Sequence, residues 1–86
     1  IGRPPKLETV DATALVSRVV AYFAARVPTR AHAVHIAAGV PEEPLEVRAD
    51  PVLLEWALES LVRNALDALA GRGGRIYVAA ERLGDG

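Results

Sequence analysis

The chain has 86 residues, so it forms at most one domain, near the lower size limit for a self-sufficient hydrophobic core. Its formal net charge of −1 gives no general attraction to nucleic acid or to an anionic membrane, so neither is expected as a partner. Cysteine is absent, which excludes disulfides and thiolate metal sites, and aromatic residues make up only 5%, so an aliphatic core is expected.

The first third of the chain predicts a linker, a strand and a helix. Residues 1–5 contain two adjacent prolines, which block helix and favour an extended linker. A short strand is predicted over residues 6–10. Asp11 is placed as the N-cap of a helix over residues 12–26, where apolar residues recur at helical spacing, and Pro28 ends that helix.

The middle of the chain predicts two short strands and then a long helix. The strands are expected over residues 33–38 and 45–48, with a proline- and glutamate-rich turn between them. Asp50 followed by Pro51 indicates a helix start, because aspartate is a favoured N-cap and proline is favoured at the first helical position. This helix is expected to run to about Ala70.

The chain then predicts a turn and a last strand. Gly71 is expected as the C-terminal cap of the long helix, and residues 75–83 read as a strand. The order strand, helix, strand, strand, helix, strand predicts an α/β (α+β) two-layer sandwich. Its sheet is expected to be mixed, with the helices on one face, and residues 6–86 to form one domain.

The long helix carries two stripes of side chains. The apolar stripe, expected to pack on the sheet, consists of Leu54, Ala57, Leu58, Leu61, Val62, Ala65, Ala68 and Leu69. The second stripe consists of Trp56, Ser60, Arg63, Asn64 and Asp67. Asn64, the only asparagine in the chain, is expected at the border of the two stripes, which suits the wall of a cleft.

The chemistry of Asn64 points to magnesium. An amide oxygen is a hard, neutral ligand, and magnesium takes oxygen ligands while it bridges to phosphates. Arg63 could offer its charge to a phosphate oxygen. On the residues alone a second interpretation stays open: Asn64 is a solvated helix residue, and Glu59 with Arg63 forms an ordinary surface pair.

A resemblance extends this reading. The segment "ADPVLLEWALESLVRNALDALAGRGGRIYV" resembles the N-box region of the ATP-binding domain of sensor histidine kinases, in the superfamily that includes gyrase and a large heat-shock chaperone. Upstream, "RPPKLETVDATALVSRVVAYFAAR" resembles the entry into that domain from the dimerisation helices. The resemblance implies a truncated Bergerat-type ATP-binding fold with ATP and Mg²⁺ as cofactors.

The resemblance also assigns roles to individual residues. It implies that Asn64 binds the magnesium that bridges the ATP phosphates, that Arg63 is the basic residue beside it, and that Asp67 lies near the phosphates or ribose. Ser60 departs from the pattern, because kinases usually have another asparagine there and hydrolytic relatives a glutamate. A serine hydroxyl does not act as a general base for water without a partner, so the substitution favours kinase over ATPase.

The resemblance implies a parent protein with several partners. Mg-ATP would donate its γ-phosphoryl group to a histidine on a separate helical dimerisation domain, from which a response regulator receives it. No apolar run reaches the roughly 20 residues that span a bilayer, so this cytoplasmic segment is not expected to contact the membrane, even in a membrane-anchored parent. The alternatives are a non-catalytic dimerisation or docking module and a hydrolysing ATPase of the same superfamily.

Both ends of the chain resemble cuts in a longer protein, since it begins at Ile1 without methionine. Gly84-Asp85-Gly86 resembles the box that reads adenine, but it follows the strand over residues 75–83 too closely. The chain alone is therefore expected to bind Mg-ATP weakly or not at all and to transfer no phosphoryl group. An exposed edge on the last strand is expected to produce a homo-oligomer.

Two other candidates are interpreted as structural. His32 and His35 are expected near one strand, where residues three apart point to opposite faces and make a poor ligand pair. Residues 71–74, with three glycines and one arginine, follow a helix and lack the Lys-Ser/Thr of a phosphate-binding loop. They are expected to form a cap and a turn.

Overall fold

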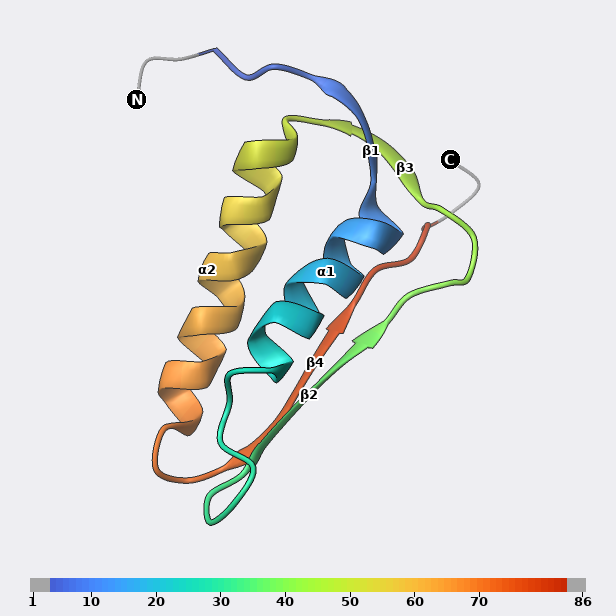
Figure 1. The fold of residues 1–86 in the computed structure, drawn as a ribbon. Helices are drawn as coiled ribbons and strands as arrows, with labels where there is room; N and C mark the ends of the chain where they lie inside the picture. Colours follow the sequence, from blue (N-terminus) through green and yellow to red (C-terminus); the bar gives the residue numbers. More distant parts are fainter. Residues whose placement is uncertain (1–3, 84–86) are drawn as a thin grey trace.

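The structure, a computed structural model, describes residues 4–83 as an α+β protein with two helices and two small sheets. The elements are β1 (Glu8–Asp11), α1 (Ala12–Ala24), β2 (Val34–Gly39), β3 (Glu46–Ala49), α2 (Pro51–Leu69) and β4 (Gly74–Ala79), as Figure 1 shows. The predicted order of strands and helices is confirmed. Residues 1–3 of the expected linker and the Gly84-Asp85-Gly86 segment lie outside the described residues.

The prediction of one mixed sheet is wrong for residues 4–83. There β1 pairs antiparallel with β3, and β2 pairs parallel with β4, as two separate two-stranded sheets. Between β2 and β3 the chain contains Pro41 and Pro44, which have no N–H to donate to a ladder. This segment carries the chain from the second sheet to the first, and the helix α1 begins directly where β1 ends, with Ala12 N–H donating to Leu45 O at 2.7 Å.

Helix α1 and strand β4 both end earlier than the sequence predicted. Helix α1 ends at Ala24 instead of the predicted Arg26, and the guanidinium of Arg26 donates to Tyr22 O at 2.8 Å, which caps the last turn. Strand β4 ends at Ala79 instead of Leu83. The last contact of β4 with β2 is the Ala80 N–H bond to Gly39 O at 3.2 Å, beyond which β2 itself has ended.

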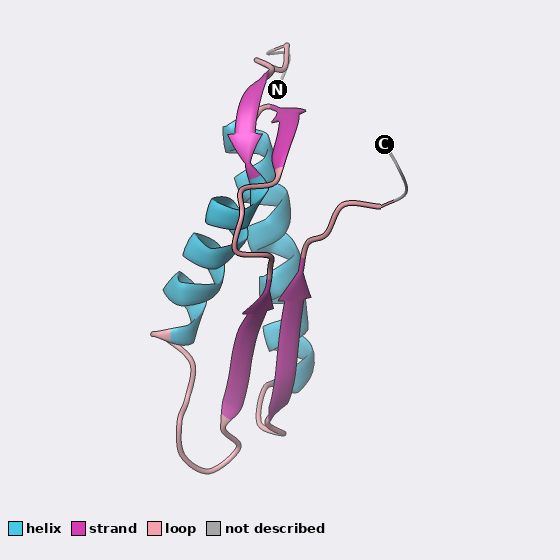
Figure 2. Cartoon of the chain, turned by 90° about the vertical axis from the view of Figure 1, so that its right-hand side faces the viewer, coloured by secondary structure: helices cyan, strands magenta, loops and turns pink. Residues whose placement is uncertain are grey.

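Both helices lie on the same side of the β2–β4 pair, as Figure 2 shows from the outer face of that sheet. The core is aliphatic, as expected, with one aromatic residue. Its buried cluster consists of Leu15, Val19 and Phe23 of α1 and Val62 of α2. Val10, Ile36, Leu54, Leu58, Leu66 and Val78 pack against this cluster and are partly buried. Helix α1 therefore supplies most of the core, and α2 adds a single buried side chain.

The predicted apolar stripe of α2 is wrong along one flank. Leu61 is 66% exposed, and Ala57 and Ala68 are also exposed, whereas Leu66, which was not in the stripe, is partly buried. The physical reason is that α2 packs against α1 as well as against β4, so its buried arc is rotated toward α1 and is centred on Val62. The exposed flank (Ala57, Leu61 and Ala68) lies on the side of α2 turned away from α1.

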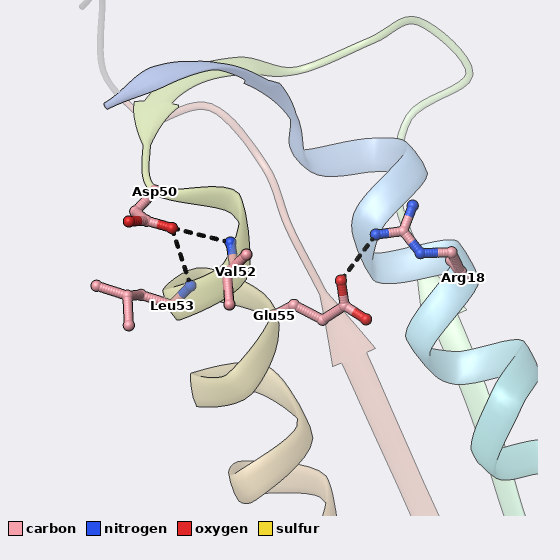
Figure 3. Close-up of polar contacts among 5 residues, drawn as sticks. All are labelled: Arg18, Asp50, Val52, Leu53 and Glu55. Carbon is pink, nitrogen blue, oxygen red and sulfur yellow. Dashed lines mark hydrogen bonds and ion pairs between the residues drawn. The ribbon is translucent and has the colours of Figure 1, made fainter. Parts of the chain in front are cut away.

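The start of α2 is held by the carboxylate of Asp50, drawn in Figure 3. One oxygen accepts the N–H groups of Val52 at 3.0 Å and Leu53 at 3.2 Å, and the other accepts the N–H of Lys6 at 2.8 Å. The predicted N-cap and the proline at the first turn are both confirmed. Asp50 thus joins the N-terminal segment before β1 to the first turn of α2.

We predict that Asp50→Ala lowers the free energy of unfolding by about 1–2 kcal/mol, because it removes the N-cap and leaves the Lys6 N–H, in the segment before β1, without its acceptor. Urea unfolding followed by circular dichroism measures this change. Asp67→Ala, which removes an exposed carboxylate late in the same helix, is the matched control and should change stability by less than about 0.5 kcal/mol. Equal effects of the two substitutions would contradict the joining role of Asp50.

Candidate functional site

The candidate site occupies the middle of α2, which the sequence makes helical through its capped start and its leucine- and alanine-rich interior. Ser60 and Asn64 are four residues apart, and Asn64 and Asp67 are three apart, so they are neighbours on one surface of the helix. All three side chains are exposed. We call these three residues the α2 polar face.

Arg63 does not belong to this face. Its guanidinium carbon lies 5.5 Å from the centre of the Phe23 ring, so the side chain leans across the contact between α1 and α2. It lines a shallow hollow there together with Tyr22, Glu55 and Glu59. The structure thus brings Ser60, Asn64 and Asp67 together and turns Arg63 toward α1.

The same α1–α2 contact contains an ion pair. Arg18 of α1 and Glu55 of α2 approach to 3.0 Å, as Figure 3 shows. The two side chains are 62% and 35% exposed, so this pair contributes at most about 1 kcal/mol to stability. Together with Arg63 and Glu59 it makes the α1 side of α2 charged, which separates that side chemically from the α2 polar face.

The α2 polar face offers neutral and anionic oxygens to solvent. Within residues 4–83 the amide of Asn64 makes no hydrogen bond to protein, so its oxygen is accessible to a ligand. The hydroxyl of Ser60 lies one turn before it and the carboxylate of Asp67 nearly one turn after it. Such a set can hold a hydrated divalent cation through one amide ligand and hydrogen bonds to its bound waters. Across the described part of the chain, no three His, Cys, Asp or Glu side chains gather at one point.

The neighbours of Asn64 differ from the expectation. The sequence predicted Asn64 at the border of the apolar stripe, but Ala57 and Ala68 beside it are exposed. In residues 4–83, Asn64 therefore lies on an open helix surface flanked by the exposed Leu61.

A hollow that the sequence reading did not identify lies at the other end of α2. It is formed between the N-terminal segment and the first turns of the helix, and Pro4, Lys6, Asp50, Val52, Leu53 and Trp56 line it. In the sequence, this hollow is indicated by the two apolar residues that follow Pro51 and by Trp56 one turn later. Trp56 is 62% exposed, so the hollow is open to solvent.

The remaining sequence candidates have structural surroundings. His32 lies in the bend before β2 with a φ of 56°, and His35 lies within β2 on the outer face of the sheet. Gly71 and Gly73 have φ values of 74° and 78°, which confirms the predicted cap and turn after α2. A side chain at Gly73 would meet Ala33 O at 2.9 Å, so this turn packs closely on the entry to β2.

Comparison of the chain with models of protein families, with characterised proteins and with solved structures finds no match. Among the helices of residues 4–83, none has the length and apolar character needed to cross a membrane.

We predict that Asn64→Ala leaves the fold intact and raises the free energy of unfolding by a few tenths of a kcal/mol, up to about 0.7 kcal/mol. The side chain is exposed and alanine is the better helix former. Thermal unfolding of the two proteins measures the difference. A loss of stability above about 1 kcal/mol would show that Asn64 has a structural partner, and the candidate site would lose its basis.

Proposed function

We propose that this chain is the part of a histidine-kinase ATP-binding domain that presents the magnesium ligand, with Asn64 as that ligand. The observation that supports it most is the α2 polar face. A single asparagine midway along α2, with a free amide and with Ser60 and Asp67 beside it, has the chemistry of a magnesium–polyphosphate wall. It stands in the segment whose sequence resembles the N-box.

The residues of the α2 polar face have separate roles in this proposal. The Asn64 oxygen binds magnesium directly, and its neutrality avoids repelling the phosphates. Asp67 and Ser60 hydrogen-bond to waters that magnesium retains, since this ion gives up its hydration shell reluctantly. Arg63 leans toward α1, so its guanidinium must swing around the helix before it can contact a phosphate oxygen.

Phosphoryl transfer fits the residues better than hydrolysis does. A hydrolysing enzyme of this superfamily needs a carboxylate that activates water one turn before the asparagine, and Ser60 stands there. The adjacent Glu59 is half-buried in the hollow between α1 and α2, about 100° around the helix from Ser60. Transfer to a histidine on a partner helical domain needs no activated water, and a response regulator would then receive the phosphoryl group.

The proposed fold is a Bergerat-type ATP-binding fold. Two helices lie over one face of a parallel strand pair, with α2 preceding β4 by a short glycine-rich turn. This arrangement, together with the sequence resemblance, supports the proposal.

A docking module is the second candidate, and one observation favours it. Leu53, Trp56 and Leu61 are 45%, 62% and 66% exposed on α2, which is a large apolar exposure for one helix of a small protein. In this function the same helix would bind a protein and its polar face would have no ligand.

We predict that Mg-ATP binds this chain in the millimolar range and that binding perturbs the backbone amide resonances of residues 60–67. The affinity is low because one wall supplies few of the polar contacts that a nucleotide requires. A ¹⁵N NMR titration measures both affinity and location. The perturbation should disappear when EDTA removes magnesium and should be much smaller in Asn64→Ala. Ser17→Ala, at an exposed position of α1, should behave like the wild type.

Micromolar binding, or perturbation elsewhere that Asn64→Ala does not change, would contradict this assignment. Binding of a protein partner to the exposed apolar side chains of α2, with no change in the spectrum on addition of nucleotide, would favour the docking module.

In a parent kinase that contains this segment, we predict that Asn64→Ala lowers autophosphorylation by about 100-fold with the fold retained. Even loss of an outer-shell metal partner costs about 10–100-fold in affinity or activity. Transfer of labelled γ-phosphate to histidine measures the effect, and Ser17→Ala is again the control. Wild-type autophosphorylation in Asn64→Ala would remove the proposed role of this residue.

A further inference from the structure

The outer edge of β4 has backbone groups that its sheet does not use. Gly74 N–H donates to Ala33 O at 3.1 Å and Ala80 N–H donates to Gly39 O at 3.2 Å, both toward β2. Because alternate residues of a strand direct their N–H and C=O groups to the same side, Arg75, Tyr77 and Ala79 direct theirs to the opposite edge. Within residues 4–83, β4 pairs only with β2.

The two edges of this sheet are not equivalent. On the far edge of β2, the Val34 N–H donates to Pro28 O at 3.1 Å, so the loop after α1 covers part of that edge. The edge of β4 contains neither proline nor lysine, the residues that commonly protect an edge from pairing. The exposed flank of α2, with Leu61, lies on the side away from α1 and can cover an added strand.

We propose that a second copy of this chain pairs with the free edge of β4, antiparallel and about a two-fold axis at Val78. The two sheets then form one four-stranded sheet in the order β2-β4-β4-β2. This assembly is independent of the proposed function, because it uses the backbone of β4 and not the α2 polar face.

Charge selects this register. With the axis at Val78, and with the pairing continued two residues past the end of β4 at Ala79, Arg75 of each copy lies opposite Glu81 of the other. Both side chains are exposed in the single chain and would lie on the outer face of the extended sheet. Tyr77 lies opposite Ala79 on the same face, and on the helix side Ile76 lies opposite Ala80. A register centred on Arg75 would instead place two arginines opposite each other, which is destabilising.

The first measurement is the mass of the 86-residue chain by light scattering during size-exclusion chromatography, over a wide range of concentrations. We expect a mass approaching twice 9.1 kDa as the concentration rises. A monomer at every concentration overturns the proposal.

Charge reversal then tests the register. Arg75→Glu places two glutamates opposite each other, and Glu81→Arg places two arginines opposite each other. Each substitution alone should weaken the dimer about ten-fold, since two attractive pairs become repulsive ones. An equimolar mixture of the two variants should recover the wild-type affinity, because every pair in the mixed dimer again joins Arg and Glu.

The mixture needs no separate control variant, because the dimer affinity of each variant is measured both alone and in the presence of the other variant. Circular dichroism of each variant checks that the fold is retained, which is expected because both side chains are exposed. A dimer that neither substitution weakens, or a mixture that stays dissociated, would place the interface elsewhere and overturn the proposal.

Discussion

The burial of Val62 between α1 and the sheet determines which side chains of α2 are exposed to solvent. Val62 is 2% exposed and is the only residue of α2 that joins Leu15, Val19 and Phe23 in the buried cluster of the described chain. Each residue of a helix turns by about 100°, so burying Val62 directs the residue two positions later away from the core. Asn64 is exposed for this reason. Leu61 comes one residue before Val62 and therefore lies about 100° around the helix from it, on the exposed flank.

Local signals were sufficient to predict the helix starts and the turn after α2. Asp11 and Asp50 act within three residues of the amides they cap, and Gly71 needs only its own backbone freedom. The rotation of α2 and the separation into two sheets depend on contacts between segments far apart in the chain. Helical spacing predicted an apolar stripe on α2. It could not indicate that α1 packs against the side of α2 that contains Glu59 and Leu66, which leaves Leu61 exposed.

For the candidate site too, the local grouping of residues could be predicted from the sequence, but the contacts with the other helix could not. Spacing alone groups Ser60, Asn64 and Asp67, because residues three and four apart on a helix are neighbours. The direction of Arg63 was not predictable, since it depends on the ring of Phe23 in the other helix. The chemistry of a site on one helix face can thus be derived from sequence, whereas its electrostatic surroundings depend on which helix packs beside it.

The α2 polar face and the free edge of β4 do not share a residue. Leu61 and Asn64 are three residues apart and therefore about 60° apart around α2, with Leu61 nearer the buried arc centred on Val62. In the proposed dimer, Arg75 and Glu81 would pair on the face of the extended sheet opposite the helices. Changing them would alter the proposed assembly without altering the proposed magnesium ligand, so each proposal can fail while the other stands.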